Sequence, residues 1–182
     1  MRERASTILD GVAVIRPYEP GDEAGCRACV VELQDAERSV DPRLRPGESI
    51  VDQYLGQMHV HCRDYSGAIF VAEQQGEIIG LVMVLARVPF EALDEPPGTY
   101  ALVAELVVRD GFRRKGTARA LLDTAERYAR DAGASELRIE VLSENTPART
   151  LYLREGFTSY KETLAKRLDL PLVSGGPDRD TP

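Results

Sequence analysis

The chain has few of the residues and segments that mark several common classes of protein. No apolar run in its 182 residues approaches the length of a membrane span. Residues 1–11 carry charges of both signs and no apolar stretch of signal-peptide length, so we expect a cytoplasmic protein without membrane association. Basic residues are also in deficit, since 23 Lys and Arg against 30 Asp and Glu give a net charge of −7. This balance argues against general nucleic-acid binding, which needs a basic face.

Cysteine and histidine are scarce, with three Cys and two His. An odd number of Cys without an export signal indicates free thiols in a reducing compartment. Cys26 and Cys29 have the spacing of a redox dithiol or of half a metal site, but they fall inside a predicted helix, whereas a thioredoxin-type pair opens one. His59, His61 and Cys62 match no familiar zinc spacing. We therefore expect these cysteines to pack on a helix face, and we expect no metal site.

The chain does contain a regular succession of predicted strands and helices. Their order, β-α-α-β-β-β-α-β-α-β, predicts a single mixed α/β domain at 11–169, with one central twisted mixed sheet flanked by helices. A flexible N-terminus (1–10) and a disordered tail rich in Gly, Pro and Asp (170–182) are expected to flank it. The predicted strands are 12–16, 68–74, 77–88, 99–109, 136–142 and 157–168, and the predicted helices are 22–38, a segment beginning at residue 49, 117–132 and 147–156.

Capping signals define the start of two of these helices. Ser49 is placed to cap the second helix, with Asp52 three residues on as its capping-box partner. Pro147 suits the first position of the last helix, with Asn145 or Thr146 as its cap.

Two strands carry residues that call for a structural reason. The strand at 99–109 is apolar almost throughout, which indicates a place in the middle of the sheet, yet it contains Glu105. The strand at 77–88 contains Gly80, which indicates a bulge or a close approach of backbone.

The segment VVRDGFRRKGTA, at residues 107–118, is the most informative in the chain. A buried strand runs into Arg113, Arg114 and Lys115, then Gly116, and then a strong helix pattern. The glycine allows close approach of a ligand, and the first turn of the helix offers unpaired N–H groups. The alternative is a solvated loop with three charges. The order of strand, cations, glycine and helix favours a binding site for an anion.

Two common nucleotide motifs do not fit this segment. Gly111 and Gly116 have the separation of a Walker motif, but Thr117 stands where the motif needs Lys. The dinucleotide fingerprint needs three glycines, and only one is in place. What remains is Arg113-x-x-Gly116-x-Ala118 after a buried strand.

This pattern resembles the acetyl-CoA signature Arg/Gln-x-x-Gly-x-Gly/Ala of the GNAT family of N-acetyltransferases. Ala118 stands where many members carry Gly. A second segment, NTPARTLYLREGF at residues 145–157, is similar to the family's segment from the fifth strand into the following helix. The two segments occur in the family's order, and the resemblance covers roughly residues 12–168.

The resemblance implies direct transfer of an acetyl group from acetyl-CoA, as cosubstrate, to a primary amine. The diphosphate of the coenzyme would lie on backbone amides, with basic side chains adding charge, and the pantetheine arm would pair with the backbone of the fourth strand. The residues that the resemblance places at the coenzyme are Leu106, Val107, Val108, Arg113, Arg114, Lys115, Gly116, Thr117, Ala118 and Asn145.

Two residues are candidates for the chemistry. Glu105 is the candidate general base, acting through water, since desolvation in a buried strand tends to raise a carboxyl pKa. The alternative is a carboxylate that faces solvent or pairs with an arginine. Tyr152 occupies the family's position for the general acid that protonates the CoA thiolate; the alternative is a core tyrosine. A backbone N–H near Val107 would hold the oxyanion.

The sequence leaves the acceptor open among small amines, aminoglycosides, polyamines, peptide N-termini and lysines. Acetyl rather than a longer acyl group follows from the resemblance alone, and a homodimer, common in such proteins, is not visible in the sequence. A non-catalytic acyl-CoA-binding or sensor module is the alternative function. Acidic side chains of the expected substrate walls would attract a cationic amine or simply be solvated: Asp35, Glu37, Asp41, Glu48, Asp52, Glu91, Asp94 and Glu95.

Overall fold

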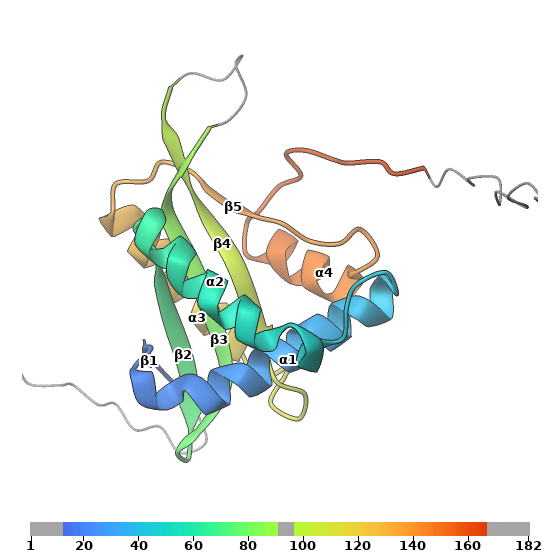
Figure 1. Cartoon of the computed structure of the whole chain (residues 1–182). Coiled ribbons are helices and arrows are strands. Elements are labelled where there is room, and N and C mark those ends of the chain that lie inside the picture. Colours follow the sequence, from blue (N-terminus) through green and yellow to red (C-terminus); the bar gives the residue numbers. More distant parts are fainter. Residues whose placement is uncertain (1–12, 91–96, 167–182) are drawn as a thin grey trace, which may run out of the picture.

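The computed structural model describes residues 13–90 and 97–166. Within them, one five-stranded sheet has the order β1-β2-β3-β4-β5 (Figure 1). The first four strands pair antiparallel with their neighbours, and β5 runs parallel to β4. The strands are β1 (Val14–Pro17), β2 (Ala68–Gln74), β3 (Glu77–Pro89), β4 (Thr99–Val108) and β5 (Leu137–Ile139).

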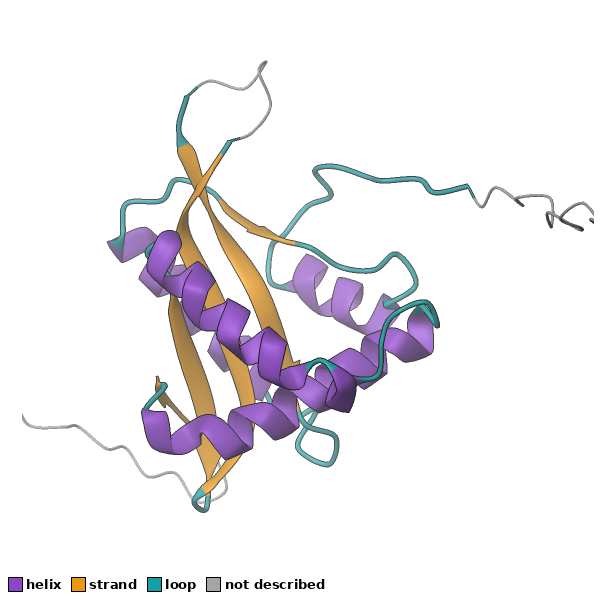
Figure 2. Cartoon of the chain, viewed as in Figure 1, coloured by secondary structure: helices purple, strands orange, loops and turns teal. Residues whose placement is uncertain are grey.

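Helices cover both faces of this sheet. Figure 2 shows α1 and α2 crossing one face, α3 behind the other, and α4 beside the end of β5. Short 3-10 turns precede the first two helices, at Pro20–Asp22 and Gly47–Ser49. The helices are α1 (Glu23–Val40), α2 (Val51–Asp64), α3 (Thr117–Asp131) and α4 (Thr146–Arg154). The predicted mixed α/β class is confirmed.

The sheet divides the interior into two apolar clusters. One lies under α1 and α2 and contains Cys26 and Cys29, whose exposed fractions are 2% and 0%. Burial raises the pKa of both thiols to about 12, so they remain protonated and poorly reactive. The prediction that they pack on a helix face is confirmed. The other cluster lies under α3, where Leu121 and Ala125 are fully buried against the sheet.

Several predicted boundaries agree with the structure. β2 spans the predicted residues, β3 extends one residue further, and both residues of the connecting turn, Gln75 and Gly76, have positive φ. α3 ends in a left-handed glycine, Gly133, whose N–H donates to Arg130 O at 3.0 Å. The predicted domain ends at residues 11 and 169, and both flanking segments, lie outside the described residues and stay predictions.

The start of α2 differs from the prediction. Its N-cap is Ile50 and not Ser49, whose hydroxyl instead donates to Pro46 O at 2.7 Å in the preceding 3-10 turn. Asp52 pairs with Arg27 of α1 and forms no capping box. Ser49 already forms part of the turn at residues 47–49, so the helix begins one residue later than the capping signal indicates.

The last two predicted strands also require correction. β5 has only three residues, although the alternating pattern predicts a strand over 136–142. No strand forms over residues 157–166, and the predicted end of the last strand, 167–168, lies outside the described residues. Residues 158–166 are exposed throughout, and no strand among the described residues pairs with them. An alternating pattern makes a strand only where another strand offers its backbone.

Gly80 shows a close approach of two backbones at the centre of the sheet. A Cβ on this residue would lie 2.6 Å from the carbonyl oxygen of Val107 and 3.3 Å from the Cα of Val108. Both atoms belong to β4, which cannot move without disturbing its pairing with β3. The predicted close approach is confirmed.

We therefore expect Gly80→Ala to lower the free energy of unfolding by about 1–3 kcal/mol, the usual effect of overpacking. Gly56, in α2, is the matched control, because a Cβ there meets nothing within 4 Å. Gly56→Ala should raise the free energy of unfolding by about 0.5–1 kcal/mol. Urea denaturation measures both. Equal midpoints for Gly80→Ala and wild type would show that β4 does not constrain this position.

Candidate active site

The site lies where two parallel strands separate. β4 and β5 pair at three positions, the last of which joins Val103 to Ile139. β5 ends there, and the chain that follows it diverges from β4 (Figure 1). On this side β4 therefore lacks a strand partner beyond Val103 within the described residues. Its backbone N–H and C=O groups border a cleft and can pair with an extended ligand.

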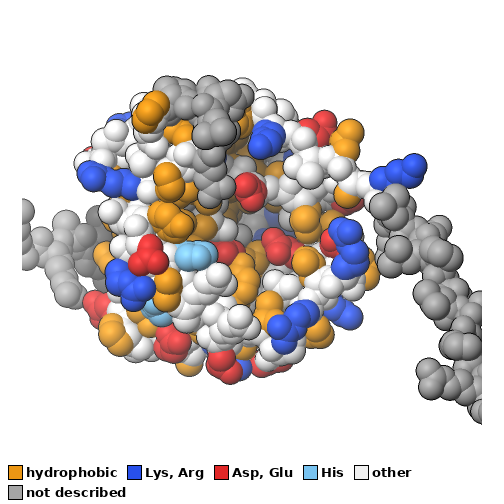
Figure 3. Space-filling model, turned by 45° about the horizontal axis from the view of Figure 1, so that its top comes forward, with side chains coloured by type: hydrophobic (Ala, Val, Ile, Leu, Met, Phe, Trp, Pro, Cys, Tyr) orange, Lys and Arg blue, Asp and Glu red, His pale blue; other side chains and the backbone are white. Residues whose placement is uncertain are grey.

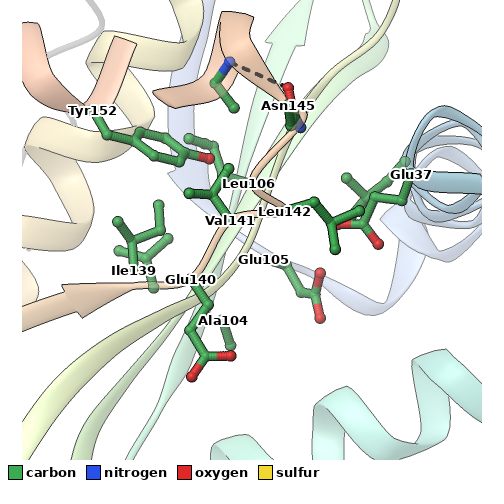
Figure 4. A pocket seen from close by; sticks show the side chains of 13 residues that line it. Glu37, Ala104, Glu105, Leu106, Ile139, Glu140, Val141, Leu142, Asn145 and Tyr152 are labelled. Atoms are coloured by element: carbon green, nitrogen blue, oxygen red, sulfur yellow. Dashed lines mark hydrogen bonds between the residues drawn. The ribbon is translucent and has the colours of Figure 1, made fainter. Parts of the chain in front are cut away.

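Four elements line the cleft (Figure 4). α1 supplies one wall, β4 and the segment after β5 form the floor and the opposite edge, and α4 closes the end. In the space-filling view the surface is hollowed near its centre, and acidic side chains gather around the hollow (Figure 3). The lining residues are Leu33, Glu37, Val103, Ala104, Glu105, Leu106, Ile139, Glu140, Val141, Leu142, Asn145, Ala148 and Tyr152.

A β-bulge in β4 decides where Glu105 points. Val84 of β3 lies opposite Val103, whereas the preceding residue, Met83, lies opposite Glu105, so Ala104 is an extra residue on β4. Without it, the two-residue alternation of a strand would put Glu105 on the same face as Val103, toward α3. The bulge turns the carboxylate to the face covered by α1 and α2.

Glu105 is half-buried and has a tyrosine partner. The Tyr54 hydroxyl of α2 donates a hydrogen bond of 2.6 Å to Glu105 Oε1. Burial raises the pKa of Glu105 to about 7, the Tyr54 hydrogen bond lowers it, and the charge of Glu37 raises it. The two alternatives, a carboxylate in open solvent or one paired with an arginine, do not describe this environment. A carboxyl group with this pKa exchanges protons readily near neutral pH.

Tyr152 is held by the way α4 ends. Gly156 has φ of +90°, and its N–H donates to Leu153 O at 3.3 Å. The next N–H, of Phe157, donates to Tyr152 O at 3.0 Å, which completes a Schellman motif. The Phe157 ring lies edge-on to the Tyr152 ring, with centroids 6.0 Å apart. The glycine and the phenylalanine of the predicted segment thus fix the position of the tyrosine.

The first turn of α4 begins at the cleft and has a side-chain cap. Asn145 is its N-cap, and the side chain accepts a hydrogen bond of 3.3 Å from Ala148 N, so of the two predicted caps the structure selects Asn145 (Figure 4). Pro147 occupies the second helical position, one residue later than predicted.

Burial raises the pKa of Tyr152 to about 12, so its hydroxyl remains a proton donor at neutral pH.

Glu105 and Tyr152 reach the cleft from opposite faces of the sheet. Figure 4 shows the Tyr152 hydroxyl directed toward Leu106, while the Glu105 carboxylate projects on the other side of β4. The strand gap is the place where both faces are accessible to one ligand. The arrangement pairs a proton acceptor with a proton donor, which suits proton transfer at two atoms of a bound ligand.

The loop from β4 to α3 leaves the helix end open. Gly111, Arg114 and Gly116 have φ of +59°, +61° and +85°, so the loop turns sharply at three points. Gly116 is the N-cap of α3 and has no side-chain cap. The first-turn N–H groups of α3, including those of Thr117 and Ala118, are therefore available to an anion.

The three cations of this loop are not equivalent. Arg113 Nε donates to Val108 O at 2.8 Å, and its terminal nitrogen donates to Glu32 of α1 at 3.1 Å. Glu32 also accepts from the backbone N–H of Asp110. Arg113 therefore braces the loop against α1, whereas Lys115 lies over the Phe112 ring, 5.4 Å from its centroid.

Sequence reasoning missed two residues of this region. Tyr54 lies in the apolar stripe of α2 with Val51, Leu55 and Met58, and a hydroxyl within a buried stripe is a signal that a polar partner lies opposite. Glu32 carries no signal in the sequence, since it is one of several carboxylates on α1.

The described part of the chain contains neither a metal-binding cluster nor a membrane-spanning helix. No group of three or more His, Cys, Asp and Glu side chains is arranged there to hold a metal ion. His59 packs against the Tyr18 ring, with centroids 5.4 Å apart. Over residues 13–90 and 97–166, no helix combines the length and the apolar character needed to cross a membrane.

Known proteins resemble this chain in sequence and in fold. It is 33% identical over 104 residues to an N-alpha-acetyltransferase of Sulfurisphaera tokodaii and 30% identical over 104 residues to that of Sulfolobus acidocaldarius. Each match covers 56% of this chain and 62% of the relative, so the chain spans about three-fifths of the relatives' length.

The fold is similar to that of an aminoglycoside N-acetyltransferase in complex with CoA. The TM-score is 0.61 at 19% identity, covering 86% of this chain and 100% of the other. The model of the Acetyltransferase (GNAT) family matches residues 30–157, which include the parted strands, the loop into α3 and the whole of α4. The chain belongs to the GNAT family of acetyltransferases.

Proposed function

We propose that this protein transfers the acetyl group of acetyl-CoA directly to a primary amine. The observation that carries the proposal is the meeting of Glu105 and Tyr152 at one cleft, where β4 has unpaired backbone and leads to the open end of α3. Membership of the family and the names of the relatives support it.

The coenzyme would be held mainly by backbone. Its diphosphate would lie on the amides of the loop and first turn of α3, where the helix dipole favours negative charge. Arg114 and Lys115 would add charge, and Arg113 would brace the loop. The pantetheine arm would pair with β4 like an added strand. The proposed coenzyme residues remain Leu106, Val107, Val108, Arg113, Arg114, Lys115, Gly116, Thr117, Ala118 and Asn145.

The chemistry needs two proton transfers. The acceptor arrives as an ammonium ion, and Glu105 takes a proton from it through water, which leaves a neutral amine to attack the thioester carbonyl. A backbone N–H near Val107 would stabilise the oxyanion. When the carbon–sulfur bond breaks, Tyr152 donates its proton to the departing thiolate. The products are the acetylated amine and CoA.

The named relatives narrow the acceptor. Two of them are N-alpha-acetyltransferases, which favours the α-amino group of a peptide as the first acceptor to test. The carboxylates of Glu37 and Glu140 at the cleft suit a cationic amine. The free, buried thiols of Cys26 and Cys29 support a cytoplasmic location.

The alternative is a module that binds acyl-CoA without turning it over. Such a module needs neither Glu105 nor Tyr152, and nothing in the described structure favours it. Release of free CoA thiol in the presence of a panel of amines distinguishes the two functions.

We expect Glu105→Gln and Tyr152→Phe each to lower kcat by about 10²-fold or more, because each removes a proton-transfer group. CoA affinity, measured by calorimetry, should stay close to wild type, since neither side chain is assigned to the coenzyme. Glu126→Gln, on the exposed side of α3, and Tyr128→Phe, whose hydroxyl donates to Ser66 O and does not line the cleft, are matched controls and should keep the wild-type rate. Full activity in both site variants would overturn the assigned roles.

The rate should also depend on pH. Since only the carboxylate form of Glu105 accepts a proton, kcat/KM should fall as the pH drops below about 7, the pKa of this group. The acidic limb should disappear in Glu105→Gln. A wild-type profile that stays flat from pH 9 to about pH 5 would exclude Glu105 as the base.

Removal of positive charge from the proposed coenzyme site should weaken CoA binding. Arg114→Ala with Lys115→Ala should weaken CoA binding about tenfold or more, the effect of losing charged hydrogen bonds. Arg127→Ala, on the exposed side of α3, is the control and should bind CoA like wild type. Calorimetry measures all three proteins. Absence of binding heat in wild type would overturn the coenzyme site itself.

A further inference from the structure

Tyr54 is half-buried in the fold rather than exposed on its surface. Its neighbours in α2, Val51 and Leu55, have exposed fractions of 0% and 5% and anchor the helix in the core beneath it. Tyr54 N–H donates to Ile50 O at 2.9 Å, in the first turn of the helix. The ring packs against the apolar cluster under α1 and α2, and its hydroxyl donates to Glu105 Oε1 at 2.6 Å.

This contact leaves the two oxygens of Glu105 in different situations. Oε1 accepts the Tyr54 hydrogen bond, so Oε2 is the oxygen left for a water or an acceptor in the cleft. A carboxylate with one oxygen fixed has a defined direction for the other, which is what proton transfer through water requires.

One nearby charge acts against the carboxylate form, and two further titratable groups face the same cleft. Glu37 of α1 lines the same cleft, and its charge raises the pKa of Glu105 in addition to the effect of burial. Glu140, after β5, and Tyr152, from α4, line it from the remaining sides. Among the groups that act on Glu105, the Tyr54 hydroxyl favours its ionised form.

We propose that Tyr54 is a positioning residue of the acetyl transfer, which orients Glu105 through Oε1 and favours its carboxylate form. The proposal rests on the proposed function. Burial and the nearby charge of Glu105 raise the pKa of Tyr54, so its hydroxyl remains a donor throughout the working range. A phenylalanine would fill the same space but leave Oε1 without this donor.

Tyr54→Phe tests the proposal through its pH profile. Loss of a hydrogen bond to a charged group should move the acidic limb of kcat/KM up by about one pH unit. Relative to wild type, the rate should fall about tenfold more at pH 6 than near pH 9, where only the loss of orientation remains. A residue that only supports the fold would lower the rate equally at every pH, and that result would overturn the proposal.

Tyr18→Phe is the matched control. The Tyr18 hydroxyl also donates to a carboxylate, Glu23 Oε2 at 2.7 Å, but this pair lies at the start of α1 and does not line the cleft. This variant should keep the wild-type pH profile. A shift as large as that of Tyr54→Phe would show a general effect of removing a hydroxyl, and would contradict the proposal.

A second measurement does not depend on turnover. In protein with 13C-labelled glutamate carboxyls and no ligand, NMR titration should show the Glu105 pKa about one unit higher in Tyr54→Phe, with Glu105→Gln assigning the signal. An unchanged pKa overturns the inference even if the enzyme is active. If no amine is acetylated, the proposed function fails, and the titration still decides whether Tyr54 controls Glu105.

A double variant completes the test. In the Glu105→Gln background, Tyr54→Phe should cause no further loss of rate, because its partner no longer accepts a proton. An additional loss as large as in the wild-type background would show that Tyr54 acts independently of Glu105 and would overturn the proposal.

Discussion

The parting of β4 from β5 is the constraint on which the site depends. Two parallel strands that stayed paired would satisfy each other's backbone groups and would leave no room between the faces of the sheet. Because pairing stops at Val103 and Ile139, β4 keeps free N–H and C=O groups, and side chains from both faces reach one cleft. The bulge at Ala104 contributes to the same site, because it turns Glu105 toward α2 immediately after the last residue of β4 that pairs with β5.

Ionisation of Glu105 lowers the free energy of unfolding. Glu105 is an acid whose folded-state pKa, about 7, lies above its ordinary value of 4.5, so the folded protein holds this proton more tightly than the unfolded chain. The stability gained from the protonated form is present below the unfolded pKa and is lost as the pH rises through about 7. At neutral pH the partly ionised carboxylate therefore opposes folding, and the Tyr54 hydrogen bond reduces that penalty. The two closely packed apolar clusters supply the stability that such a site needs.

The two proposed binding regions are rigid for different reasons. The loop into α3 is held by α1, because Glu32 accepts hydrogen bonds from both the Arg113 guanidinium and the Asp110 N–H. The N–H groups at the start of α3 therefore need not hold the loop in place. Tyr152 is fixed from within its own helix, because the left-handed Gly156 closes the last turn around its carbonyl. In both cases the residue that holds the region in place, Glu32 or Gly156, lies outside the proposed contacts with ligand, so binding requires little ordering of the chain.

The sequence by itself determined the elements and features whose signals are local. The hairpin of β2 and β3, the helix after Gly116, the Asn145 cap and the family motifs all depend on residues within one or two turns of each other, so composition and spacing were sufficient. Only the tertiary structure decided the bulge at Ala104, the partnership of Tyr54 with Glu105, and the short β5 with no strand after it. Each of these depends on a neighbour distant in sequence: a strand needs a partner's backbone, and a buried hydroxyl needs an acceptor that the fold brings to it.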